Sequence, residues 1–301
     1  MSQLHELDFN QLSIFLLHGV VEKSNYQVRN YTSKHLDLAV FIEYMQNFKR
    51  IGHAMSMDQV VDYLTEKKPF PPNSFAVTFD DGFENNFSVA MPVLEALEIP
   101  ATFYITTGFI QENKMSWIDR IEYCFEMSQS VTIQLPWRNE FIEMCDPKSK
   151  IALLTEIRDQ VKNSAAINPE YFADDICRQS GFEQLKSSQD PLDLKLSWEQ
   201  IQTLHAHPLF TIGGHTHTHA ILSFLGPEDL NFEVKTSLDL LKSFAQVQTN
   251  HFSYPEGLSH CYNSEVIKCL KSHGIVCSPS AEAGRNPQGT DLFHLKRINL
   301  T

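Results

Sequence analysis

The stretch from Phe75 to Gly82 constrains the fold of this chain more than any other feature. Five residues of β character, Phe75 to Phe79, run directly into Asp80, Asp81 and Gly82. Such a run is typical of a strand buried on both faces, as in a parallel sheet. A helical pattern follows, with apolar residues at Phe87, Ala90, Leu94 and Leu97. The two carboxylates therefore stand at the carboxyl end of a strand, the edge at which α/β sheets and barrels bind ligands.

The pair Asp80-Asp81 has two interpretations. Neighbouring side chains on an extended chain point in opposite directions, so one carboxylate could hold a metal ion while the other stays free as a base. Asp and Gly are also ordinary turn residues, so a solvent-exposed turn fits equally well. The pair alone does not decide between a turn and a site.

Strand-like and helical patterns alternate along most of the chain. The expected strands lie at 13–17, 75–79, 101–105, 210–214, 251–255, 275–277 and 295–298. Helical patterns between them lie at 36–48, 58–66, 87–97, 230–241 and 266–270. This order favours parallel strands joined by right-handed crossovers. The sequence therefore predicts an α/β protein, either a barrel or an open sheet.

Residues 111–196 differ from this alternating pattern. The region is polar, has few strand-like runs, and carries apolar residues at helical spacing in Ile151, Leu154, Ile157 and Val161. We expect a helical insertion within a single domain that spans residues 1–301.

Composition narrows the partners and the compartment. The chain has 301 residues and a formal net charge of −13, which disfavours nucleic acid and anionic membranes as partners. The six cysteines are scattered without a CxxC pair, so free thiols are expected. Residues 1–6 have no basic character and the first apolar stretch, 12–17, is short. We therefore expect neither a signal peptide nor a membrane span, and a cytoplasmic location.

A second polar cluster, His215-Thr216-His217-Thr218-His219, follows an expected strand end and two glycines. Neutral imidazole is the commonest metal ligand. In a helical turn His215 and His219 would face the same way, whereas in an extended chain all three histidines would line one face. A carboxylate from another strand end would complete a zinc site that keeps an open position. A His-rich polar loop without a metal is the alternative.

Taken together, the two clusters resemble the polysaccharide deacetylase family, carbohydrate esterase family 4, which is built on the NodB homology domain. Thr78-Phe79-Asp80-Asp81-Gly82 matches its first motif, T-F-D-D-G, and His215 to His219 matches its second, H-[S/T]-x-x-H. The resemblance covers about residues 12–100 and 197–298. It implies a deformed (β/α)7 barrel of NodB type, with the helical insertion at about 111–196.

The resemblance also implies a chemistry. Asp81, His215 and His219 would bind one divalent metal ion, with zinc expected, although such a site also accepts cobalt, nickel or iron. Asp80 would be the general base that takes a proton from water. The implied reaction hydrolyses an N-acetyl or N-formyl group from an amino sugar in a polysaccharide, glycan or glycan precursor. The partner would thus be a glycan or small molecule that carries an N-acyl amino sugar.

The family's third motif is altered in this chain. The matching stretch is 252–257, where Ser253 stands at the position of an arginine that commonly pairs with the base. Arg297, on the last expected strand, is the candidate replacement, a hypothesis that full activity of Arg297→Ala would exclude. Tyr254 remains a candidate oxyanion donor through its backbone N–H.

Two histidines are candidates for the general acid that protonates the leaving amine. His294 fits the family's late motif loosely, but the neighbouring strand could direct it away from the site. His18 follows the first expected strand, and strand ends converge on one face of a barrel, so His18 is preferred. His217 is expected outside the metal site. Trp117 and Trp198 could stack on a sugar ring or belong to the core.

Two other functions compete with this interpretation. Amidohydrolases that use a His-x-His pair usually carry it on the first strand, whereas this cluster is late and follows Asp80-Asp81. A non-catalytic sugar-binding protein of the same fold has no use for a free base beside a metal ligand. The motifs therefore favour a metal-dependent N-deacylase.

Overall fold

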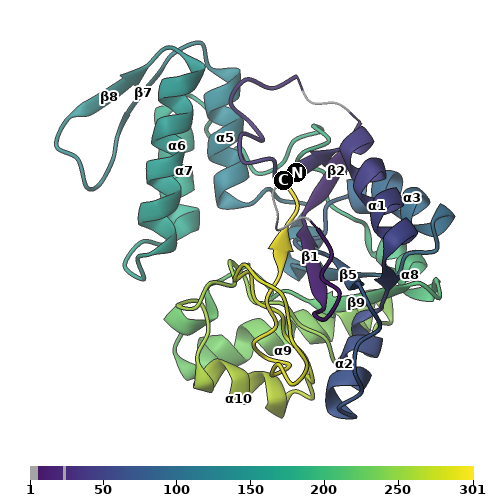
Figure 1. The fold of residues 1–301 in the computed structure, drawn as a ribbon. Helices are drawn as coiled ribbons and strands as arrows, with labels where there is room; N and C mark the ends of the chain where they lie inside the picture. Colours follow the sequence, from purple (N-terminus) through teal and green to yellow (C-terminus); the bar gives the residue numbers. More distant parts are fainter. Residues whose placement is uncertain (1–5, 23–24) are drawn as a thin grey trace.

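Six parallel strands form the sheet at the centre of the fold, and helices cover it (Figure 1). The computed structural model describes residues 6–22 and 25–301, so the predicted absence of a signal peptide at the N-terminus falls partly outside the described residues. The neighbours in the sheet follow the order β10-β1-β5-β6-β9, and β4 pairs with the start of β5. The strands are β1 (Ser13–Leu17), β4 (His53–Ala54), β5 (Ser74–Phe79), β6 (Ala101–Ile105), β9 (Phe210–Gly214) and β10 (Ile298–Asn299).

Single parallel bridges close this sheet into a ring. Gly214 pairs with Phe252, His251 with Cys277, and Ala283 with Arg297. Arg297 leads into β10, which pairs with β1. The ring in the described residues thus has seven positions, namely β1, β5, β6, β9 and the segments 251–253, 277–283 and 297–299. This is the predicted (β/α)7 barrel, deformed where bridges replace full strands.

Side chains of β5 alternate between two apolar layers. Phe75, Val77 and Phe79 belong to the cluster shared with the surrounding helices, where Phe75 contacts Phe48. Ala76 belongs to the cluster inside the barrel. Because the alternation has a period of two, Asp80 follows Ala76 and Thr78 toward the barrel interior. The covering helices are α1 (Leu38–Ile51), α2 (Met57–Thr65), α3 (Met91–Ala96), α4 (Thr107–Glu112), α8 (Trp198–Ala206), α9 (Pro227–Ala245) and α10 (Ser264–Ser272).

The insertion forms a separate lobe beside the barrel (Figure 1). It contains α5 (Trp117–Met127), α6 (Pro147–Lys162) and α7 (Pro169–Gln179), packed on an apolar cluster of their own. It is mainly helical, as predicted, and it also contains an antiparallel hairpin that was not predicted, formed by β7 (Val131–Gln134) and β8 (Phe141–Met144). The alternating burial of β7, with Val131 and Ile133 inward, is the signal that the helical prediction overlooked.

A short parallel pair, β2 (Gly19–Val21) and β3 (His35–Asp37), brackets the polar N-terminal segment and was not predicted. A Cβ on Gly19 would lie 2.2 Å from His35 Nδ1 and 2.6 Å from Asn85 Oδ1. Glycine therefore suits the position directly after His18, because the buried side chains of His35 and Asn85 pack against the backbone there.

Two further expectations concern cysteines and membrane spans. All six cysteines are free. In the part of the chain that the structure describes, every helix is too short or too polar to cross a membrane.

Candidate metal centre and active site

The seven predicted site residues meet at one end of the barrel. Six of them lie at or beyond the carboxyl end of a ring position, whereas Arg297 is the first residue of the segment 297–299. All seven line a pocket of about 250 Å³. They are His18, Asp80, Asp81, His215, His219, Tyr254 and Arg297. The rule that ligand sites lie at this edge of a barrel therefore accounts for every predicted residue except Arg297.

Asp80 and Asp81 both face this pocket, although an extended chain would have sent them in opposite directions. Strand β5 ends at Phe79, and Asp81 has a φ of +76° while Gly82 has a φ of +85°. The left-handed turn redirects the second carboxylate toward the side of the first. Both carboxylates consequently lie within 4 Å of His215 Nε2, Asp80 Oδ2 at 3.9 Å and Asp81 Oδ1 at 3.6 Å.

Asp81, His215 and His219 have the geometry of a metal-binding triad. Their ligand atoms lie within 4.8 Å of one another. Asp81 Oδ1 is 3.6 Å from His215 Nε2 and 3.3 Å from His219 Nε2. Ligand atoms around a tetrahedral zinc ion lie about 3.4 Å apart, given bonds of about 2.1 Å. Asp81 Oδ1 is buried and has no hydrogen-bond partner among the described residues, so the three residues fit a divalent cation.

Hydrogen bonds around the triad fix how the imidazoles point. His215 Nδ1 lies 2.8 Å from the Ser253 carbonyl oxygen, which makes Nδ1 the donor and leaves the lone pair of Nε2 for a metal. Glu233 of α9 accepts from the backbone N–H groups of His217 and Thr218, both at 2.8 Å. This carboxylate thereby holds the loop between the two ligands. Sequence reasoning missed Glu233, since it lies in a helix beyond the motif.

His217 lies outside the triad, as expected from the motif. Its Nδ1 is 3.1 Å from Thr107 Oγ1, and its ring contacts Phe232 edge-on. The segment is neither a helical turn nor extended, because Thr216 and His219 both have left-handed backbones.

Arg297 is the ion-pair partner of Asp80. Its Nη1 lies 2.9 Å from Asp80 Oδ1 and its Nη2 2.8 Å from Oδ2, in a bidentate pair that is almost fully buried. Ser253 Oγ accepts from Arg297 Nη2 at 3.0 Å, so the small serine leaves room for a guanidinium from another strand. Burial raises the pKa of Asp80, but Arg297, together with His215 and His18, holds it below its ordinary value. Asp80 is therefore ionised at neutral pH.

Lys34 and Asp119 also belong to this site, and sequence reasoning missed both. Lys34 Nζ lies 3.2 Å from Asp81 Oδ2 and 3.2 Å from Asp119 Oδ1, so one ammonium joins the triad to α5 of the insertion. Burial raises the pKa of Asp81, but Lys34 and His219 hold it well below its usual range. No local motif predicts the contact between Lys34 and Asp119, because the two residues are 85 positions apart in the sequence.

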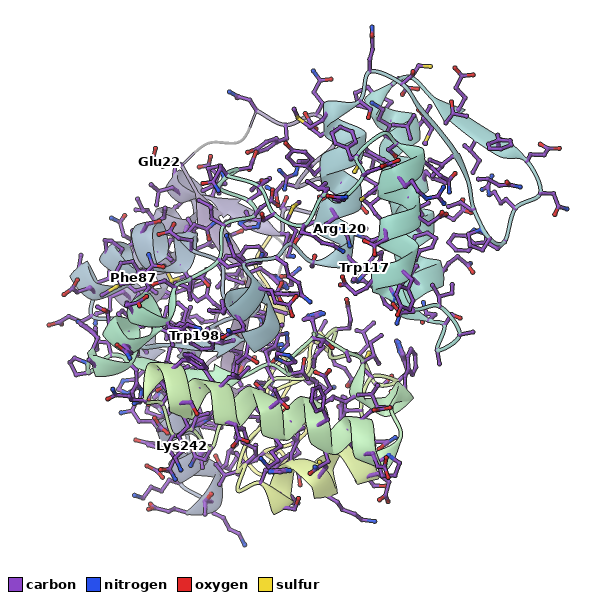
Figure 2. The ribbon with its side chains drawn as sticks, turned by 180° about the vertical axis from the view of Figure 1, so that it is seen from behind. Glu22, Phe87, Trp117, Arg120, Trp198 and Lys242 are labelled. Atoms are coloured by element: carbon purple, nitrogen blue, oxygen red, sulfur yellow. The ribbon has the colours of Figure 1, made fainter. Side chains whose placement is uncertain are left out.

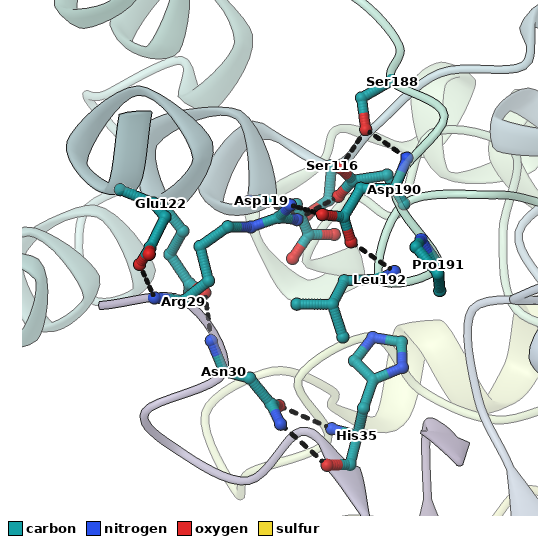
Figure 3. A network of polar contacts seen from close by, with 12 residues as sticks. Arg29, Asn30, His35, Ser116, Asp119, Glu122, Ser188, Asp190, Pro191 and Leu192 are labelled. Atoms are coloured by element: carbon teal, nitrogen blue, oxygen red, sulfur yellow. Dashed lines mark hydrogen bonds and ion pairs between the residues drawn. The ribbon is translucent and has the colours of Figure 1, made fainter. Parts of the chain in front are cut away.

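The segment that carries Lys34 is fastened to the insertion by further polar contacts (Figure 3). Glu122 of α5 accepts from the Asn30 backbone N–H at 3.2 Å, and Arg29 Nη1 lies 3.3 Å from Asp190 Oδ2. Lys34 thus extends from a segment whose position depends on the insertion.

The two candidates for the general acid lie in different places. His18 lines the pocket, and burial is the main cause that lowers its pKa to about 4. His294 is exposed and does not line the pocket; its Nδ1 lies 3.3 Å from Tyr262 Oη. Of the two, only His18 is positioned to meet a substrate at the triad.

Tyr254 and the two tryptophans complete the predicted set. Tyr254 lines the pocket, its ring stacks on Tyr262 at 4.1 Å, and its backbone N–H has no acceptor among the described residues. Trp117 also lines the pocket. Trp198 instead stacks on Phe244 against the barrel core, on the far side from the insertion (Figure 2). Trp117 can therefore contact a ligand at the triad, whereas Trp198 is a packing residue.

Known structures share this fold at low sequence identity. The Streptococcus pyogenes deacetylase PplD in complex with acetate aligns with a TM-score of 0.61 and 16% identity, over 97% of this chain and 93% of that one. IcaB from Ammonifex degensii aligns with a TM-score of 0.60 and 18% identity, over 98% and 94%. The BpsB deacetylase domain from Bordetella bronchiseptica aligns with a TM-score of 0.55 and 15% identity, over 98% and 97%.

The sequence itself matches a family model. A search of curated proteins found no match. The model described as polysaccharide deacetylase, in contrast, matches residues 67–278, which is more than half of the chain and includes both motifs. Members of this family are hydrolases that act on carbon–nitrogen bonds other than peptide bonds. This chain therefore belongs to the polysaccharide deacetylase family.

Proposed function

We propose that this protein is a metal-dependent hydrolase that removes an N-acetyl or N-formyl group from an amino sugar of a glycan. One observation carries the proposal. A buried carboxylate held by a bidentate arginine, Asp80, lies directly beside a donor triad that fits a divalent cation, Asp81 with His215 and His219. A protein that only binds sugars gains nothing from placing a charged, oriented base there.

Asp80 acts as the general base. Its low pKa keeps it ionised, and the arginine fixes its orientation while leaving lone pairs on both oxygens. Asp80 takes a proton from the attacking water. A divalent cation held by the triad, with zinc expected, supplies Lewis-acid chemistry when bound, since it polarises a carbonyl and lowers the pKa of water.

Two further groups act on the tetrahedral species that forms when water attacks the amide carbon. The Tyr254 backbone N–H, which has no acceptor in the described chain, donates to the oxyanion. His18 delivers a proton to the leaving amine as the carbon–nitrogen bond breaks. Because its pKa of about 4 makes it neutral at pH 7, His18 must first gain a proton, and the one that Asp80 took from water is available.

The test measures metal and product together. The protein is stripped with a chelator, reloaded with zinc, cobalt or nickel, and incubated with N-acetyl and N-formyl amino sugars and their oligosaccharides. We expect acetate or formate and an equal amount of free amine, from the reloaded protein only. Asp80→Asn should bind the metal as the wild type does but release product about 10²–10⁴ times more slowly.

Three results would contradict the proposal in different ways. Release from the stripped protein at the full rate would mean amide hydrolysis without the triad's metal. Metal uptake with no release from any acylated sugar would favour a sugar-binding protein. Absence of both would exclude the enzyme altogether.

A further inference from the structure

His18, the residue assigned to protonate the leaving amine, lies in a gap between two strands. β1 ends at Leu17 and β2 begins at Gly19, so neither strand includes His18. Its side chain lines the metal pocket together with that of Asp80. A proton donor must stand within hydrogen-bond reach of the group that it protonates. The contacts that hold the backbone around His18 therefore decide where the imidazole can stand.

The first of these contacts comes from the base. β1 and β5 pair in parallel with Leu17 opposite Phe79, and the Asp80 backbone N–H donates to the Leu17 carbonyl oxygen at 3.0 Å. His18 and Asp80 are the residues that directly follow this pair. The register of two neighbouring strands thus brings the proposed acid and the proposed base to the same edge of the barrel.

Two buried asparagines hold the chain immediately after β1. Asn86 Nδ2 donates to the His18 carbonyl oxygen at 2.8 Å, and Asn85 Oδ1 accepts from the Val20 backbone N–H at 3.2 Å. Asn86 is 0% exposed and Asn85 is 3% exposed. Hydrogen bonds of buried side chains are costly to lose, because a buried group left without its partner also lacks water. Side chains, rather than strand pairing, therefore fix the backbone on both sides of Gly19.

Asn85 is itself held by two other segments of the chain. Its Nδ2 donates to the Pro191 carbonyl oxygen at 3.1 Å and lies 3.0 Å from His35 Nδ1. The amide thereby uses its oxygen and both of its N–H groups. Because these partners belong to three separate segments, reorienting the side chain would break contacts with all three. Asn85 is therefore a fixed support for the backbone of Val20.

An unusual helical turn carries this pair of asparagines. Asn86–Ala90 is a π-helical turn, in which the Met91 backbone N–H donates to the Asn86 carbonyl oxygen, and Asn85 stands directly before it. Turns of this kind are rare and frequently lie at functional sites. The turn follows the first motif without a break. The base, one metal ligand and the two asparagines therefore all lie within residues 80–86.

We propose that Asn85 and Asn86 are positioning residues for the proton donor, which hold the backbone of residues 18–20 so that the His18 imidazole meets the leaving amine. The inference rests on the proposed function, because it takes His18 to be the donor. Residues 80–86 then set the geometry of both proton transfers. Asp80 takes a proton from water, and the two asparagines hold the group that delivers one to the amine.

A double-mutant cycle tests whether Asn86 acts through His18. Asn86→Leu keeps the approximate volume but removes the donor. In the zinc-loaded protein, kcat for the release of acetate from an N-acetylated oligosaccharide should fall by about 10–10²-fold, as is typical when a catalytic group is misplaced. In a His18→Ala background the same change should cost less than about twofold, because the group that it positions is gone. A purely structural role would lower kcat by the same factor in both backgrounds.

Ser88→Ala is the matched control. Ser88 belongs to the same π-helical turn but is exposed, and its hydroxyl donates to Glu84, so kcat should stay within about twofold of the wild type. Asn86→Ala replaces Asn86→Leu if thermal unfolding shows that the leucine variant is not folded. Full kcat in a folded Asn86 variant, or equal losses in both backgrounds, would overturn the proposal. The wild-type rate in His18→Ala would overturn it too, while the release of acetate would still support the proposed function.

Histidine resonances separate the two failures if the wild type hydrolyses no probe. Zinc-loaded protein with isotope-labelled histidine is compared with its variants by NMR, and His18→Ala assigns the His18 signals. A shift of these signals in Asn86→Leu but not in Ser88→Ala would support the positioning of His18 even though the proposed function had failed. Unchanged signals in Asn86→Leu, or equal shifts in both variants, would overturn the positioning role as well.

Discussion

The barrel and the insertion are built and joined in different ways. The barrel is held by backbone pairing between parallel strands, and its ring positions supply His18, Asp80, Asp81, His215 and Arg297. The insertion packs on an apolar cluster of its own. Charged contacts such as Lys34–Asp119 and Lys162–Glu256 connect it to the site. The strand register thus fixes the groups assigned to the chemistry, whereas side-chain ion pairs connect the insertion to the site.

This difference separates two kinds of mutational effect. Changes to residues of the barrel rim should act on the chemical step, because strand ends cannot shift independently of the sheet. Changes on the insertion side should act on substrate binding or on metal affinity, because they alter side chains that line the pocket or contact a metal ligand. Each variant below tests that division.

The largest effect is expected for Arg297→Ala, on the barrel side. Loss of the guanidinium leaves Asp80 buried without a partner, so kcat should fall about 10²–10⁴-fold. Burial alone then raises the pKa of Asp80, and the acid limb of the rate profile should move to higher pH. The measurement is kcat and kcat/KM against pH for the zinc-loaded variant.

Arg297→Lys is the matched control for this variant. It keeps the charge but loses the fork that contacts both oxygens, so its activity should lie between those of the wild type and Arg297→Ala. Because a broken buried pair can cost about 3–5 kcal/mol of stability, thermal unfolding of both variants must show a folded protein at the assay temperature. A folded Arg297→Ala protein with full activity would remove this residue from the site.

The next effect distinguishes the two histidines. His18→Ala should lower kcat by about 10². His294→Ala should stay within about twofold of the wild type, because exposed residues away from the site have small effects. Both are measured as full pH–rate profiles. If both variants keep the wild-type alkaline limb and rate, neither histidine is the proton donor.

A smaller effect is expected where the two regions meet. Lys34→Met removes the ammonium that holds Asp81 Oδ2, so zinc affinity should fall by about 10–100-fold, as is typical when a partner of a metal ligand is lost. Competition with a chromogenic chelator measures the affinity directly, without relying on turnover. Lys34→Arg should restore part of it, and unchanged affinity in Lys34→Met would show that Lys34 does not brace the ligand.

The smallest effect is expected for Lys162→Met on the insertion. A partly exposed ion pair contributes at most about 1 kcal/mol, so KM for a tetrasaccharide should change by less than about fivefold, with kcat unchanged. Steady-state kinetics on that probe give both constants. A large fall in kcat would contradict the expectation that residues of the insertion affect binding and not the chemical step.

The sequence predicted the barrel site because its information is local. Asp80-Asp81 and His215 to His219 each lie in a short motif at a strand end, and parallel strands bring such ends together. Even Arg297 could be proposed as the partner of Asp80, because Ser253 stands where the family's third motif has the arginine that pairs with the base. Backbone detail was less accessible: the left-handed turn at Asp81, which brings the two carboxylates together, contradicts the alternation expected of an extended chain.

The insertion and the ion pairs that connect it to the site were harder to predict from the sequence. Lys34 and Asp119 meet through tertiary packing, with no spacing rule that links a polar N-terminal segment to the first turn of a helix. The hairpin was missed for another reason. Val131 to Gln134 alternates, but its partner strand, 141–144, is largely exposed and carries no pattern of its own. One patterned strand beside three helices was outweighed by the helical signal.

Closure of the barrel and pairing of Asp80 depend on the same segment of the chain, 297–299. The segment 297–299 closes the ring onto β1, and its first residue is the partner of Asp80. A chain that has assembled every earlier position still has an open sheet edge and a buried carboxylate without its counterion. On the proposed mechanism, hydrolysis therefore requires the segment 297–299 to be in place, because this segment both closes the ring and supplies the partner of the base.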